Sequence, residues 1–119
     1  MATIAVVDDT ADDRELFKVF FASEHNTITF DSGAAFLDGH RTGLFDLVLL
    51  DLVMPELDGY EVYAEIRQRG DNVPVVALSA GAYPSDRERA LKAGLTNFVT
   101  KPLVDLEQFR NYINQLLRK

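Results

Sequence analysis

The strongest constraint on the fold of this chain is an alternation of short apolar runs with segments of helical periodicity. Residues 4–7, 47–50 and 73–78 are made almost wholly of apolar residues. Strands of a parallel sheet have this composition when helices cover both faces of the sheet. Together with weaker runs at 27–30 and 97–100, the sequence predicts five strands.

Helical patterns separate the strands, and several of them carry residues typical of helix ends. We expect helices at 11–21, at 34–39, from near 58 or 59 onward, from about 85 to 94, and at 106–117. Thr10 with Asp13, and Ser85 with Glu88, are spaced as capping boxes, and Gly94 is placed to end the fourth helix. The expected buried faces consist of Leu16, Phe17, Phe20 and Phe21, then Val62, Tyr63 and Ile66, and finally Leu106, Phe109, Ile113, Leu116 and Leu117.

This order of elements predicts the fold class. Five strands that alternate with five helices form an α/β fold, a doubly wound parallel sheet with right-handed crossovers. The 119 residues fit one domain, which we expect to cover residues 1–119. In such sheets, ligands and chemistry collect at the carboxyl ends of the strands. The candidate functional residues therefore follow the predicted strands directly.

Composition excludes several classes of function. The formal charge of −7, from 19 acidic and 12 basic residues, disfavours direct binding to nucleic acid. No cysteine is present, so disulfide scaffolds and cysteine metal sites are excluded. The apolar runs are too short to cross a membrane, and the start of the chain has no signal-peptide pattern. We therefore expect a cytoplasmic protein without a membrane partner.

Polar residues follow four of the strands. They are Asp8 and Asp9, then Asp51, Ser79 and Lys101. Three carboxylates in one cleft repel each other, and a hard divalent cation such as Mg²⁺ resolves that conflict. Taken alone, Asp8 and Asp9 could instead be a charge pair at a helix N-terminus.

A carboxylate in this setting can attack a phosphoryl group and form an aspartyl phosphate. Asp51 is the best nucleophile, because it ends the central strand of the predicted sheet. Asp8 and Asp9 are better placed as metal ligands. Lys101 and the Ser79 hydroxyl could balance charge on the transferred group.

The chain also resembles the receiver domains of response regulators. The resemblance covers nearly the whole chain and is carried by Val6-Val7-Asp8-Asp9, Leu49-Leu50-Asp51-Leu52-Val53-Met54-Pro55, Asp58-Gly59, Ala77-Leu78-Ser79-Ala80 and Thr100-Lys101-Pro102. It implies a flavodoxin-like sheet with strand order 2-1-3-4-5. It also implies that Asp51 receives a phosphoryl group from a histidine kinase or a histidine phosphotransfer protein.

The same resemblance assigns further roles. Asp8, Asp9 and Asp51 would bind Mg²⁺ together with the backbone carbonyl of Val53, and Ser79 and Lys101 would contact the phosphate. Ser79 and Phe98 would act as the switch residues. The output surface would comprise the fourth helix, fifth strand and fifth helix. The output partner is not identified, and a homodimer formed on phosphorylation is compatible with the pattern.

Some positions depart from the commonest pattern of the family. Phe98 has no hydroxyl, so it would act through packing alone, and burial in the core is its simpler role. Val53 and Gly81 offer no polar side chain to orient water, which predicts a long-lived phosphorylated state. Gly81 also either makes the loop after Ser79 mobile or only permits a turn. The bond before Pro102 is expected to be cis, as the family often shows.

Three other functions compete with this interpretation. A haloacid dehalogenase-type phosphatase would need a second aspartate where Val53 stands. A flavodoxin-like cofactor binder would need a hydroxyl- and glycine-rich loop in place of Asp8-Asp9-Thr10. A phosphorylation-independent adaptor would not need the acidic cluster. We therefore expect a signalling domain that is not an enzyme acting on outside substrates.

Residues outside the strand-end cluster receive plainer roles. His25 and His40 are expected to be solvated loop residues. Tyr60 and Tyr63 are expected to pack the third helix.

Overall fold

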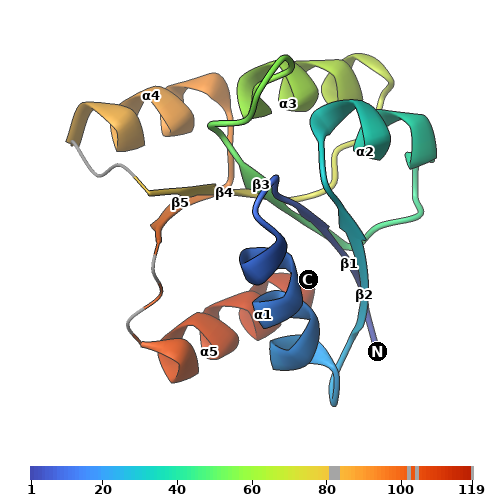
Figure 1. Cartoon of the computed structure of the whole chain (residues 1–119), viewed down its shortest axis with the longest axis vertical. Helices are drawn as coiled ribbons and strands as arrows, with labels where there is room; N and C mark the ends of the chain where they lie inside the picture. The colour runs from blue at the N-terminus through green and yellow to red at the C-terminus, as the bar shows by residue number, and fades with distance from the viewer. Residues whose placement is uncertain (81–83, 102, 104, 119) are drawn as a thin grey trace.

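The computed structural model describes residues 1–80, 84–101, 103 and 105–118, and within them it contains one five-stranded sheet and ten elements (Figure 1). The elements are β1 (Thr3–Val7), α1 (Ala11–Phe21), β2 (Asn26–Phe30), α2 (Gly33–Gly39), β3 (Leu47–Asp51), α3 (Gly59–Gln68), β4 (Val75–Ser79), α4 (Pro84–Ala93), β5 (Asn97–Thr100) and α5 (Leu106–Leu117). No helix in the described ranges is both long and apolar enough to span a bilayer.

The sheet confirms the predicted fold class. All four strand pairings are parallel, and the order is β2-β1-β3-β4-β5. Helices α1 and α5 cover one face, and α2, α3 and α4 cover the other (Figure 1). Because all strands run the same way, the ends of β1, β3, β4 and β5 lie on a single edge of the sheet.

Each face of the sheet has its own apolar core. Alternate strand residues such as Val7, Leu50 and Ala77 pack towards α2 and α3. The residues between them, such as Leu49 and Leu78, pack on the other face with phenylalanines of α1 and α5. β3 and β4 are buried along their whole length, which explains why their sequences are continuous apolar runs.

The helix ends match the sequence in part. α3 begins after Asp58, whose carboxylate accepts from the Glu61 N–H while the Glu61 side chain accepts from the Asp58 N–H. Gly94 follows α4 with a φ of +107°, a conformation that favours glycine. The predicted capping box of Ser85 is wrong, because α4 already begins at Pro84. A proline suits the first helical position, where no intrahelical N–H bond is lost.

The prediction of a capping box at Thr10 is also wrong. Thr10 is the N-cap residue of α1, but its side chain makes no capping hydrogen bond. The Asp13 carboxylate accepts from Lys101 instead. Leu16 and Leu106, expected in the buried faces of α1 and α5, are 44% and 42% exposed.

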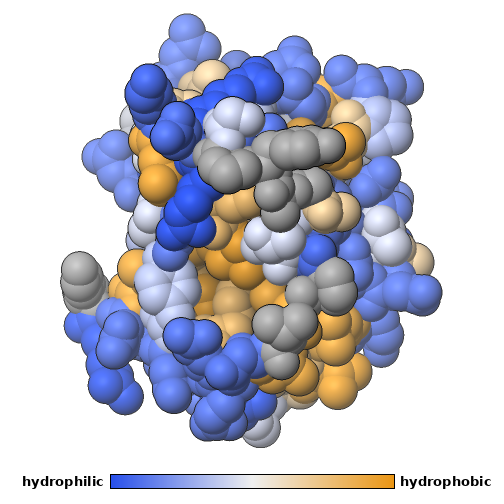
Figure 2. Space-filling view, turned by 90° about the vertical axis from the view of Figure 1, so that its left-hand side faces the viewer, coloured by the Kyte–Doolittle hydropathy of each residue, from blue (hydrophilic) through white to orange (hydrophobic). Residues whose placement is uncertain are grey.

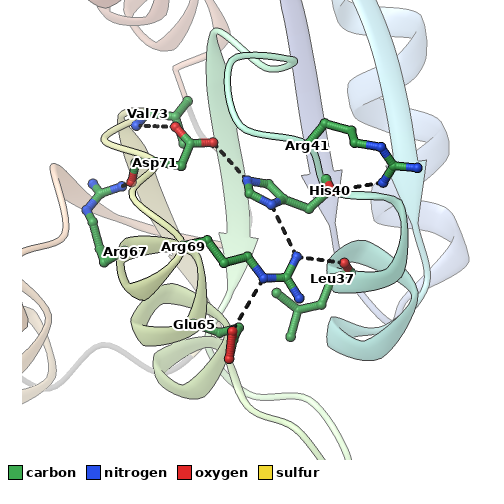
Figure 3. Close-up of polar contacts among 8 residues, drawn as sticks. All are labelled: Leu37, His40, Arg41, Glu65, Arg67, Arg69, Asp71 and Val73. Carbon is green, nitrogen blue, oxygen red and sulfur yellow. Dashed lines mark hydrogen bonds and ion pairs between the residues drawn. The ribbon is translucent and has the colours of Figure 1, made fainter.

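The expectation that His40 is solvated is wrong, since only 5% of this residue is exposed. Figure 3 shows its ring between the side chains of Asp71 and Arg69. Its Nε2 lies 2.8 Å from Oδ2 of Asp71, and Arg69 Nη1 lies 3.3 Å from its Nδ1. An arginine only donates, so Nδ1 accepts and Nε2 donates to Asp71. Asp71 also accepts from the Val73 N–H at 3.0 Å, and Arg69 donates to the Leu37 carbonyl at 2.9 Å. This network ties the end of α2 to α3 and to the segment before β4.

The other histidine is also bonded. His25 accepts a hydrogen bond from the Ala2 N–H at Nδ1, and its Nε2 lies 2.9 Å from Oδ1 of Asn114. Tyr60 and Tyr63 are partly buried against the core, as expected.

We predict that Asp71→Ala lowers the free energy of unfolding by about 2–4 kcal/mol, because it leaves the His40 Nε2–H and the Val73 N–H buried without an acceptor. Urea unfolding followed by circular dichroism measures the loss. Asp38→Ala removes an exposed carboxylate of α2 and should change stability by less than about 0.5 kcal/mol. Equal losses in the two variants would contradict a structural role for the network.

Candidate functional site

The carboxyl edge of the sheet brings the predicted site residues to one place. Asp8 and Asp9 directly follow β1, Asp51 is the last residue of β3, and Ser79 is the last residue of β4. Lys101 follows β5, and its ammonium reaches Asp8 and Asp51 at the ends of β1 and β3. β1 and β3 are neighbours in the sheet, with Val7 opposite Leu50. The adjacent strand ends place the aspartates side by side.

The three aspartates form a compact acidic cluster. Asp8, Asp9 and Asp51 each offer a carboxylate oxygen within 4.8 Å of the others. Asp8 is fully buried and Asp51 is 4% exposed, whereas Asp9 is exposed. Backbone N–H groups orient the two buried carboxylates, since Asp8 accepts from the Thr10 N–H at 2.9 Å and Asp51 from the Val53 N–H at 3.0 Å.

Lys101 supplies positive charge to this cluster. Its Nζ lies 3.1 Å from Oδ2 of Asp8, 3.3 Å from Oδ2 of Asp51 and 3.0 Å from Oδ2 of Asp13. The sequence interpretation missed Asp13 as a member of the site. Its position in the first turn of α1, a helix that starts at the carboxyl edge, is the feature that could have indicated it.

The surroundings shift the pKa of Asp51. Burial raises the pKa of this carboxyl from 3.8 to about 6, against the opposing effects of the Val53 N–H and the Lys101 ammonium. The negative charge of Asp8 raises it further. For Lys101, burial lowers the pKa, but hydrogen bonds to Asp13 and Asp8 and the charge of Asp51 raise it above its usual value overall. Lys101 is therefore a fixed cation.

Close packing of α3 holds the end of β3 in place. A Cβ built on Gly59 would lie 2.6 Å from the backbone oxygen of Asp51 and 2.7 Å from Cα of Leu52. Only glycine fits this approach without a backbone shift. Gly59 therefore allows the N-terminus of α3 to pack directly on the strand end that carries Asp51.

The donor set of the cluster fits a hard divalent cation. It consists of carboxylate oxygens, two of them on buried residues, and Mg²⁺ prefers oxygen ligands at close range. One lysine does not neutralise the three aspartates of the cluster together with Asp13. The arrangement can therefore bind a metal, and the Val53 carbonyl as a further ligand stays a prediction.

Ser79 and Phe98 lie beside this cluster. Ser79 is 6% exposed and ends the strand next to β3, where Asp51 pairs with Leu78. Phe98 is 4% exposed and points into the core beneath α4. Both line a pocket of about 430 Å³, together with Val53 and residues of α3 and α4. The predictions about Gly81 and Pro102 fall outside the described residues.

Comparisons with known proteins agree with this geometry. The model of the response regulator receiver domain matches residues 4–114. An uncharacterized 14.6 kDa protein of Leptolyngbya boryana is 36% identical over 110 residues, covering 90% of this chain and 84% of the relative. The response regulator MprA of Mycobacterium leprae is 32% identical over 119 residues, covering all of this chain and 52% of the relative. The chain thus spans about half the length of that regulator.

Solved structures show the same fold. The receiver domain of DrrB, activated with BeF3, superposes with a TM-score of 0.90 at 26% identity and covers 100% of this chain and 99% of that one. The response regulator TrrA of Thermotoga maritima, in complex with Mg(2+)-BeF, gives 0.83 at 29% identity and covers 98% and 99%. On the sequence match, the fold and the acidic strand ends together, the chain belongs to the family of response regulator receiver domains of two-component systems.

Proposed function

We propose that Asp51 accepts a phosphoryl group from a phosphohistidine of a histidine kinase or of a histidine phosphotransfer protein. The single observation that carries this proposal is the buried Asp51 carboxylate, which lies among two further carboxylates and one ammonium at the carboxyl edge of the sheet. Phosphoryl transfer depends mainly on positioning and charge neutralisation, which this arrangement supplies.

The step balances in atoms and charge. A carboxylate oxygen of Asp51 forms a bond to phosphorus, while the bond between phosphorus and the imidazole nitrogen of the donor breaks and the imidazole leaves. The Val53 N–H holds one Asp51 oxygen, Oδ1, at 3.0 Å. Lys101 and the Ser79 hydroxyl would contact the phosphoryl oxygens.

The metal that we propose is Mg²⁺, held by Asp8, Asp9 and Asp51, with the carbonyl of Val53 as a further ligand. When bound, Mg²⁺ would offset the charge of the carboxylates and of the phosphoryl oxygens. The protein catalyses only its own phosphorylation and dephosphorylation. It would do so in the cytoplasm, where we place its phosphodonor.

The output surface that we propose lies on α4, β5 and α5. A pocket of about 400 Å³ lies there, and its lining includes Phe98, Val99, Leu103, Phe109 and Tyr112. Figure 2 shows a hollow with a hydrophobic floor, bordered in part by hydrophilic residues, on the side of the molecule where β5 and α4 lie in Figure 1. Such a surface suits a protein partner or a second copy of the domain.

We further propose that the phosphorylated state is long-lived. Val53, next to Asp51 in space, is 73% exposed, and its side chain offers neither a donor nor an acceptor to a water molecule. A water that attacks phosphorus would therefore gain no orientation from this position.

The first prediction concerns phosphorylation itself. With Mg²⁺ and acetyl phosphate, intact-mass spectrometry should show one added phosphate, and Asp51→Asn or EDTA should abolish it. The beryllofluoride complex should likewise form in the wild type alone. Absence of both the phosphate adduct and the beryllofluoride complex would overturn the proposal and leave a phosphate-independent adaptor as the function.

The second prediction concerns pH. The folded protein raises the pKa of Asp51 from 3.8 to about 6, so ionised Asp51 destabilises the fold above pH 6, and this cost disappears as the pH falls towards 3.8. In EDTA, Asp51→Asn should therefore increase the free energy of unfolding by up to about 3 kcal/mol at pH 7.5, and by about half of that at pH 5. Urea titrations at both pH values measure the difference, and a gain that does not depend on pH would contradict this account.

The third prediction concerns the lifetime of the phosphorylated state. Val53→Asn combined with Gly81→Asn introduces polar groups that can orient water, so dephosphorylation should accelerate roughly tenfold, equivalent to about 1.4 kcal/mol in the barrier. Loss of the phosphate adduct after removal of acetyl phosphate gives the rate. Val19→Asn changes a 66% exposed valine of α1 and serves as the control. Little acceleration in the double variant would count against the proposed lifetime.

A further inference from the structure

The Asp13 carboxylate makes one contact that neither its place in α1 nor the acidic cluster explains. Its Oδ2 lies 3.0 Å from Nζ of Lys101, the shortest of the three carboxylate contacts of that ammonium. Asp13 is not one of the three aspartates whose oxygens converge within 4.8 Å. Nor does it complete the capping of α1, because the Thr10 N–H donates to Asp8. Its interaction is therefore directed at Lys101.

The ammonium of Lys101 is fully engaged in this state. An ammonium group has three hydrogens, and three carboxylates lie within 3.3 Å of Nζ. A phosphoryl group on Asp51 would bring further oxygens and negative charge to the same place. On phosphorylation the Asp51 carboxylate loses its charge, so its contact with Lys101 passes to the phosphoryl oxygens. For Lys101 to give these oxygens more than that one hydrogen bond, its contact with Asp8 or with Asp13 has to weaken.

Burial decides which carboxylate can yield. The side chain of Asp8 is 0% exposed, so its release from Lys101 would leave a desolvated charge. The side chain of Asp13 is 30% exposed, so water can replace the ammonium there at a small cost. Lys101 also stays anchored without Asp13, because Asp8 holds it at 3.1 Å. Asp13 is therefore the partner that gives way.

We propose that Asp13 is a positioning residue that holds Lys101 in its resting place and competes with the phosphoryl group for that ammonium. This inference rests on the proposed phosphorylation of Asp51. The carboxylate of Asp13 opposes phosphorylation, since it draws the cation away and adds a negative charge close to the incoming one. The site is thus held towards its unphosphorylated state by one residue of α1.

Two adjacent residues allow a matched test. Asp12 and Asp13 are both acidic residues in the first turn of α1, so Asp12→Asn and Asp13→Asn change net charge and helix-end electrostatics alike. Asp12 is exposed and makes no ion pair among those that the described residues form. Any difference between the two variants therefore reports the contact with Lys101.

The primary measurement is the affinity for beryllofluoride in the presence of Mg²⁺, determined by NMR titration. We expect Asp13→Asn to lower the dissociation constant about two- to fivefold, the range for a partly exposed ion pair, and Asp13→Ala at least as much. The acetyl phosphate reaction should accelerate by a similar factor. Asp12→Asn should match the wild type, and Asp13→Glu should return the affinity towards it.

The free energy of unfolding of the variants distinguishes competition for Lys101 from structural damage. Asp13→Asn should leave the free energy of unfolding unchanged or lower it while the affinity rises, whereas a merely structural role would lower both. Equal affinities of Asp12→Asn and Asp13→Asn, or a weaker affinity in Asp13→Asn, would overturn the inference. A wild type that binds no beryllofluoride and takes no phosphate would instead overturn the proposed function.

Discussion

The structure depends on one electrostatic constraint, the burial of like charges at the end of a parallel sheet. Asp8 and Asp51 are almost fully buried and lie side by side because β1 and β3 are neighbours. Two such carboxylates repel each other in a medium of low polarity, and only Lys101 reaches between them among the described residues. Burial raises the pKa of Asp51, and the charge of Asp8 raises it further. A bound cation would therefore reduce the repulsion between these carboxylates and stabilise the site.

The fold meets this constraint by keeping its apolar core apart from its polar site. The helices α2 and α3 and the helices α1 and α5 bury the apolar faces of the sheet, so the central strands β3 and β4 are apolar up to their last residue. The site carboxylates Asp8 and Asp51 lie at the ends of β1 and β3, where backbone N–H groups of the following loops orient them. Close approach of α3 at Gly59 then fixes the strand end that carries Asp51. The packing of helices on both faces of the sheet stabilises the fold, and the functional side chains lie at the carboxyl edge of the sheet.

The sequence predicted those features that depend on local pattern. Apolar runs located the strands within two residues, and the rule for strand ends grouped Asp8, Asp51 and Lys101. The strand order came from the family resemblance, because apolar runs do not say which strands are neighbours. His40 was misjudged because its partner Asp71 lies 31 residues away. Asp13 was misjudged for a similar reason, since an ion pair across 88 residues outweighed a local capping pattern.

Phe98 shows how packing could carry the response to phosphorylation in this chain. Its ring is already inside, at 4% exposure, and it has no hydroxyl, so a change of state cannot add a hydrogen bond there. The ring and Ser79 share one pocket beneath α4, and in the described part of that helix only Ala90 is buried. Polar contacts therefore hold α4 in its place, since Arg87 donates to the Phe98 carbonyl at 3.0 Å and Arg89 lies 4.2 Å above the ring of Tyr60. In the switch that the family resemblance implies for Ser79 and Phe98, a shift of Ser79 towards the phosphoryl group would alter the shared pocket, and a helix with so little buried apolar surface could follow at small cost.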